Sequence, residues 1–102
     1  MQVIAFTIAE KFARKHRDAN TWLARWREIV EAAEWHNLVD IREDFPQADG
    51  VKLKSRIVVT VFNVKGNEYR LLTFVQYEDQ TVLVLDVMTH AEYSRDTWKD
   101  RF

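Results

Sequence analysis

The sequence VTVFNVKGNEYRLL, residues 59–72, has two apolar arms joined by a polar turn that contains Gly66. β-Branched and aromatic residues favour strands, and the short turn favours their antiparallel pairing, so the stretch predicts a β-hairpin. Its turn and flanks carry amides and cations that a purely structural hairpin does not need. A second polar cluster, Thr89-His90-Ala91-Glu92-Tyr93, follows the next strand. If the strands pair in chain order, both clusters reach one edge of the sheet and form a candidate site.

The pattern around the hairpin predicts an α+β fold, with an N-terminal strand and two helices packed on an antiparallel β-meander. We expect strands at residues 3–6, 56–62, 69–77 and 81–88. Consecutive strand residues, whose side chains point to opposite faces of the sheet, are often both apolar, for example Leu71 and Leu72. We therefore expect both faces of the sheet to be covered. The connector, residues 37–46, is expected to hold a short helical turn over residues 39–44 and to be too polar to pack deeply.

Two helices are expected before the connector. Thr7-Ile8-Ala9-Glu10 has the form of a capping box, which predicts a helix from about Ile8. Asp18 or Asn20 is expected to cap the second helix. Its apolar residues recur with helical period and predict a face packed on the sheet or an interface with another chain: Trp22, Leu23, Trp26, Ile29, Val30 and Ala33.

Length and composition limit the class of protein. A chain of 102 residues with 47% hydrophobic residues predicts a single domain, residues 1–102. It has no cysteine, no apolar run of membrane-spanning length and no basic leader, so we expect a cytoplasmic protein without a membrane contact. Fifteen Lys and Arg against sixteen Asp and Glu give a formal charge of −1, so any nucleic-acid contact must come from a local patch.

The order of elements and two motifs resemble the HigB family of toxins within the RelE-like superfamily. The motifs are Phe62-Asn63-Val64-Lys65-Gly66-Asn67-Glu68-Tyr69-Arg70-Leu71 and, about twenty residues later, Thr89-His90-Ala91-Glu92-Tyr93. Ala33-Glu34-Trp35 and Asp44-Phe45-Pro46 extend the similarity over nearly the whole chain. Ser94 departs from the family, whose members often have Asp there.

The resemblance implies an mRNA endoribonuclease toxin (mRNA interferase) of a type II toxin-antitoxin pair. Such a toxin commonly cleaves mRNA on the translating ribosome and is silenced by a helix-turn-helix antitoxin of the HigA type. Contact with operator DNA is expected only through the antitoxin complex. The alternative is a protein of the same fold without nuclease activity, either an inhibitor of another target, as ParE-type relatives are, or a partner-binding module.

Three residues are candidates for the catalytic roles in such a reaction. Arg70 can grip phosphate oxygens with its planar fork, although a strand arginine can also pair with Asp86 or Glu68. His90 follows a core strand and can exchange a proton near neutral pH, although a lone histidine there is often a cap or a surface residue. Tyr93 can stack on a base or position a phosphate, or it can be a half-buried lid.

Four further residues are candidates for RNA binding. Asn63 and Asn67 can bond bases or phosphates, but asparagine beside glycine also serves turn formation. Lys65 is a phosphate contact or an exposed turn charge. Lys99 lies in a tail where Asp96 and Asp100 cancel much of the positive charge.

The sequence lacks the residue patterns that a metal site or a serine hydrolase requires. His16, His36 and His90 are not at metal-ligand spacing, so we expect no metal and no cofactor. Asp86, His90 and Ser94 have no nucleophile elbow, which argues against a serine hydrolase. The nuclease interpretation instead requires Arg70 and His90 to border one solvent-open hollow.

Overall fold

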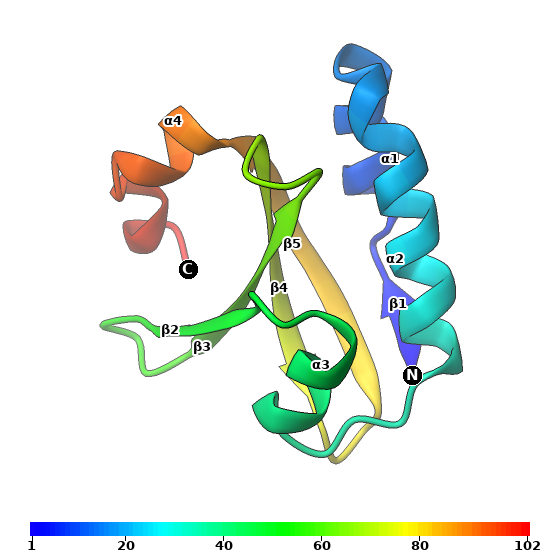
Figure 1. Cartoon of the computed structure of the whole chain (residues 1–102). Helices are drawn as coiled ribbons and strands as arrows, with labels where there is room; N and C mark the ends of the chain where they lie inside the picture. Colours follow the sequence, from blue (N-terminus) through cyan, green and yellow to red (C-terminus); the bar gives the residue numbers. More distant parts are fainter.

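A computed structural model describes the whole chain, residues 1–102, and confirms the predicted α+β class (Figure 1). One sheet holds five strands in the order β1-β5-β4-β3-β2. The strands are β1 (Gln2–Ile4), β2 (Asp49–Lys52), β3 (Val58–Val64), β4 (Tyr69–Gln76) and β5 (Thr81–Thr89). The helices are α1 (Thr7–Lys15), α2 (Asn20–Ala32), α3 (Leu38–Asp44) and α4 (His90–Ser94), with 3₁₀ helices η1 (Arg17–Ala19) and η2 (Thr97–Asp100). None of the helices combines the length and apolar character needed to cross a membrane.

The strands from β2 to β5 pair antiparallel, as the meander prediction requires. Two features of the sheet were not predicted. The N-terminal strand β1 adds to the outer side of β5 in the parallel direction. The strand β2 forms from Asp49-Gly50-Val51-Lys52, a sequence with weak strand propensity, because β3 offers it a full set of backbone partners.

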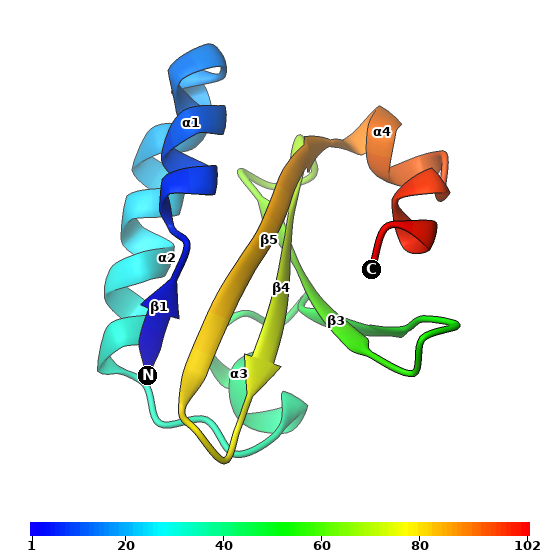
Figure 2. The ribbon, with the colours of Figure 1, turned by 180° about the vertical axis from the view of Figure 1, so that it is seen from behind.

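Helices α1 and α2 cover one face of the sheet, and the C-terminal segment lies on the opposite side (Figure 1, and from behind in Figure 2). The larger core lies on the helix side, where Leu23, Trp26 and Val30 of α2 are buried in one cluster with Phe62 and Leu71 of the sheet. The helical period of the sequence therefore identified the buried face of α2.

The predicted helix caps are wrong. The helix α1 begins at Thr7 itself, after Phe6, and no side chain caps it. The helix α2 follows η1 almost directly, so neither Asp18 nor Asn20 occupies a capping position with a side-chain hydrogen bond. Asp18 instead contacts the hairpin, as described below.

The connector packs more deeply than its polarity suggested. The helix α3 begins after Asn37, whose side chain accepts a hydrogen bond from the backbone N–H of Asp40 at 3.0 Å. Ile41 is fully buried, and the ring of Phe45 lies edge-on to Phe62 at 5.2 Å between centroids. The prediction of shallow packing is wrong because Leu38, Ile41 and Phe45 pack into or against the helix-side core, although Val39 stays exposed.

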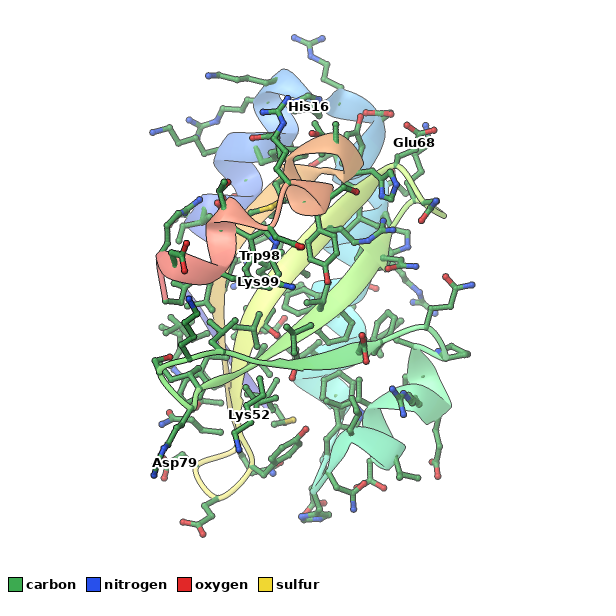
Figure 3. All side chains as sticks on the ribbon, turned by 90° about the vertical axis from the view of Figure 1, so that its left-hand side faces the viewer. His16, Lys52, Glu68, Asp79, Trp98 and Lys99 are labelled. Atoms are coloured by element: carbon green, nitrogen blue, oxygen red, sulfur yellow. The ribbon has the colours of Figure 1, made fainter.

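The second face of the sheet is covered by α4, η2 and the chain end (Figure 3). A smaller core there consists of Leu53, Val59, Val61, Leu72, Met88 and Trp98. Trp98 is only 2% exposed, and its indole N–H donates to the carbonyl of Tyr93 at 3.0 Å. The expectation that both faces are covered is confirmed, and Trp98 anchors the cover on this side.

Trp98→Ala is expected to lower the free energy of unfolding by about 3 kcal/mol, because truncating a buried aromatic residue removes its burial and leaves a cavity. Urea denaturation followed by circular dichroism measures the loss. Thr97→Ala, an exposed neighbour, serves as the control and should change stability by less than about 0.5 kcal/mol. Equal stability of the two variants would show that Trp98 does not hold the segment on the sheet.

Candidate active site

The hairpin of β3 and β4 places Arg70 on the face covered by the C-terminal segment. Arg70 pairs with Asn63 across β3 and with Met88 across β5. Its side chain is largely covered, with the residue 7% exposed. The turn at residues 65–68 is confirmed, and Gly66 takes a positive φ of 68° that favours glycine.

The guanidinium of Arg70 is held by neutral oxygens alone. It donates to the Tyr69 carbonyl at 3.0 Å, to the Asn67 carbonyl at 3.3 Å and to the side-chain oxygen of Asn67. It pairs with neither Asp86, which binds Arg101 at 2.9 Å, nor Glu68, so the structural alternative considered for Arg70 is wrong. A buried cation without a counter-ion is costly, and an anion beside it would relieve that cost.

Tyr93 covers the guanidinium of Arg70. The centre of its ring lies 5.5 Å from the guanidinium carbon, and the ring also stacks on Trp98, with centroids 5.2 Å apart. Burial raises the pKa of the Tyr93 hydroxyl, and the charge of Asp49 acts in the same direction. The hydroxyl therefore keeps its proton at neutral pH and can donate a hydrogen bond to an oxygen.

The two motifs meet at one end of the sheet. Tyr69 pairs with Thr89, and the backbone N–H of His90 donates to the carbonyl of Glu68 at 3.1 Å. Thr89 caps α4 through a capping box with Glu92, which confirms the predicted helical turn after Thr89. His90 is exposed on this first turn, and its imidazole makes no hydrogen bond or ion pair.

The predicted open hollow between Arg70 and His90 is absent. None of the surface hollows is lined by either residue. The physical reason is the packing of Tyr93 and Trp98, which closes the sheet face over Arg70. Arg70 and the start of α4, which carries His90, thus lie at the same end of the sheet, but no cleft connects the two side chains.

The four residues predicted to bind RNA do not converge. Asn63 donates to the side-chain oxygen of Gln47 at 2.7 Å, and Asn67 holds Arg70. Lys65 reaches η1, where its ammonium lies 3.2 Å from Asp18. Lys99 lies beside Trp98, as Figure 3 shows, and pairs with Asp96 at 3.3 Å.

A tether between the hairpin and η1 was not predicted. The hydroxyl of Tyr69 donates to both oxygens of Asp18, at 2.7 and 3.0 Å, and Lys65 completes the contact. Asp18 and Tyr69 are 51 residues apart, so local sequence carries no sign of the contact. The tether fixes the turn that carries Lys65 and Asn67, next to the strand of Arg70.

Tyr69→Phe is expected to reduce the loss of stability at alkaline pH. The hydrogen bond to Asp18, with burial, raises the pKa of Tyr69 to about 12. An unfolded tyrosine ionises near ~10, so this contribution is complete below about pH 10 and is lost as the pH rises to about 12. Melting temperatures between pH 8 and 12 should therefore fall more steeply for the wild type. Asp18→Asn should reproduce the shallower slope, whereas parallel curves would contradict the tether.

No group of three or more His, Asp or Glu residues in the chain is arranged to hold a metal ion. The candidate site thus consists of a buried guanidinium, a protonated phenol above it and an exposed imidazole near the same end of the sheet. A guanidinium can neutralise phosphate, and the other two groups can move or donate a proton.

Comparison with known proteins decides the family. The model of a family described as HigB_toxin, the RelE-like toxic component of a toxin-antitoxin system, matches residues 19–96. The chain belongs to the HigB toxin family. The HigB resemblance of the two motifs is therefore confirmed, since this match includes both of them.

Known relatives of this HigB-family chain carry consistent names. The mRNA interferase toxin HigB of Escherichia coli strain K12 is 29% identical over 93 residues, which cover 91% of this chain and 88% of that protein. The mRNA interferase HigB of Shigella flexneri matches with the same identity and coverage. That of Escherichia coli O6:H1 is 24% identical over 97 residues, 95% of this chain and 92% of the relative.

Proposed function

We propose that this HigB-family chain is an endoribonuclease that cleaves mRNA and thereby inhibits translation. The observation that carries the proposal is the buried guanidinium of Arg70, which has no acidic partner and lies beside Tyr93. A phosphodiester would supply the missing negative charge. The names of the relatives, which describe mRNA interferases, support the same activity.

The cleavage chemistry requires no metal. The ribose 2′-oxygen forms a bond to the adjacent phosphorus, the bond from phosphorus to the 5′-oxygen breaks, and the products carry a 2′,3′-cyclic phosphate and a 5′-hydroxyl. Arg70 stabilises the charge that develops on the non-bridging oxygens. His90 moves a proton at the 2′-oxygen or at the leaving 5′-oxygen. The neutral hydroxyl of Tyr93 positions the phosphate.

Substrate must displace the cover of Arg70. Tyr93 lies on α4, a five-residue helix with no fully buried residue. Trp98, which is buried in the smaller core, belongs to the following η2. A shift of α4 would uncover the guanidinium and bring the phosphate to it. Binding energy from RNA beyond the cut phosphate is available for this rearrangement.

The partners follow from the charge and the family. A formal charge of −1 provides little general attraction to RNA, so we propose that the ribosome positions the mRNA for this toxin. A HigA-type helix-turn-helix antitoxin is proposed to silence it, with operator DNA contacted only through that complex. A reading frame for such a protein next to this one would support the pairing.

The closed face over Arg70 favours one alternative, a toxin of this fold that inhibits another target without cutting RNA, as ParE-type relatives do. In that case Arg70 is a structural residue that fastens the turn through Asn67. Expression in cells separates the two functions. Growth arrest with loss of mRNA supports the nuclease, and growth arrest with intact mRNA supports the alternative.

Incubation of the purified protein with mRNA tests the proposal directly. Programmed ribosomes and free mRNA are compared, and the ends of the products are mapped. We expect cleavage of the ribosome-bound mRNA at least tenfold faster than of free mRNA, with cyclic phosphate ends. Equal rates on both substrates would contradict the dependence on the ribosome, and intact mRNA in both would contradict the activity.

A further inference from the structure

A hollow of about 280 Å³ opens at the sheet edge beyond the start of β2. Its walls come from α2, the end of α3, the segment between α3 and β2, β3 and the hairpin turn. They include Trp22, Asp44, Phe45, Gln47, Asn63 and Gly66. Neither Arg70 nor Tyr93 lines it. The hollow is therefore separate from the buried guanidinium, and the catalytic scheme above does not use it.

Two aromatic rings form the apolar wall. Trp22 and Phe45 are both half-buried, with ring centroids 5.9 Å apart. Phe45 is held in place by edge-on contacts to Phe62 and to Trp35, at 5.2 and 6.1 Å. Fixed and partly exposed aromatic faces are the surfaces on which unstacked bases of single-stranded RNA are bound.

A row of polar atoms borders these rings. The side-chain amide of Asn63 donates to the side-chain oxygen of Gln47 at 2.7 Å, which orients both groups. The bond leaves the Asn63 oxygen free to accept and the Gln47 amide free to donate. One oxygen of Asp44 accepts from the Trp35 indole at 3.0 Å, and its second oxygen makes no hydrogen bond. The hollow thus offers two acceptor oxygens, on Asn63 and Asp44, together with the free N–H groups of the Gln47 and Asn63 amides.

The charge of the lining selects the ligand. No lysine or arginine contributes to it, and its single charged side chain is the carboxylate of Asp44. Such a lining repels a phosphate or a carboxylate. It favours a flat, uncharged ring with an NH₂ group on its edge, which describes the bases that carry an exocyclic amine: adenine, guanine and cytosine.

The position relative to Arg70 connects the hollow to an RNA chain. Asn63 and Arg70 are directly opposite in the β3–β4 pair, and paired α-carbons lie about 4.5–5.5 Å apart. A cation for phosphate and a hollow for a base are therefore adjacent across two strands. We propose that the hollow holds an amine-bearing nucleobase of the RNA substrate next to the cut phosphate, an inference that rests on the proposed function.

Titration with neutral nucleosides tests the ligand class without any cleavage. Adenosine, cytidine and uridine are added at millimolar concentration to the full ¹⁵N-labelled chain. We expect shifts of the Gly66 amide, the Trp22 indole and the side-chain amides of Gln47 and Asn63. Uridine, which lacks the amine, should bind about threefold to tenfold more weakly, the usual worth of one hydrogen bond.

Variants complete the test. Gln47→Ala and Asn63→Ala should each weaken adenosine binding about threefold to tenfold, while Gln2→Ala, an exposed glutamine on β1, should bind as the wild type does. Shifts located elsewhere, equal binding of uridine, or unaltered binding by both variants would overturn the inference.

Cut-site mapping distinguishes failure of this inference from failure of the proposed function. If the hollow reads a base, Gln47→Ala should cleave mRNA with a relaxed preference at the nucleotide beside the cut. Cleavage with an unchanged preference would overturn the inference and leave the nuclease in place. Localised nucleoside binding by a wild type that never cuts mRNA would support the base site and refute the nuclease.

Discussion

Arg70→Ala is expected to slow mRNA cleavage by about 10²–10³-fold, because it removes the donors that stabilise charge on the phosphate in the transition state. Toxicity in cells should be lost together with the cleavage. Arg70→Lys should retain part of the activity, because an ammonium keeps the positive charge but not the planar fork. Single-turnover rates on programmed ribosomes measure the three proteins on one scale.

Two controls make this result specific to the phosphate contact. Arg25→Ala removes an equal charge from an exposed ion pair with Glu28 on α2 and should cleave at the wild-type rate. Thermal unfolding by circular dichroism checks the fold of Arg70→Ala, because the variant also loses the bonds to Asn67 and Tyr69. A folded Arg70→Ala that cleaves as fast as Arg25→Ala would remove Arg70 from the mechanism.

His90→Ala is expected to slow cleavage by about 10²–10⁴-fold, the usual contribution of a positioned acid or base. His90 is exposed and makes no hydrogen bond or ion pair through its imidazole, so its replacement should leave stability nearly unchanged. A loss of rate without a loss of stability is the signature of a group that acts on substrate.

His36→Ala is the matched control for His90, since both residues are exposed and both variants remove one imidazole. It should cleave at the wild-type rate. If His90→Ala cleaves as fast as His36→Ala, His90 has no part in the reaction.

The sequence predicted which segments meet, because the pairing of successive strands is local. The turn at Gly66 and the chain order bring Glu68 beside His90, as their backbone hydrogen bond shows. The strand β2 escaped prediction, since Asp49 and Gly50 have poor strand propensity and pair only because β3 is present. The parallel addition of β1 likewise depends on the position of the finished sheet.

The contacts around the site residues could not be predicted from local sequence patterns. The tether of Asp18 to Tyr69 joins residues 51 positions apart. The cover over Arg70 depends on how α4 and η2 pack, where Trp98 stacks on Tyr93 and the Tyr93 ring lies over the guanidinium. Motif spacing gave the candidates for catalysis and the family, while the closed sheet face required the tertiary structure. The roles assigned to Arg70, His90 and Tyr93 stay predictions.

Replacement of a single hydroxyl in the substrate tests the proposed reaction most directly. After the cut site in a ribosome-bound mRNA is mapped, the nucleotide on its 5′ side is changed to 2′-deoxyribose. With the attacking 2′-hydroxyl removed, cleavage at that position should fall to background while the unmodified mRNA is still cut. Undiminished cutting of the deoxy substrate would contradict attack by the 2′-oxygen.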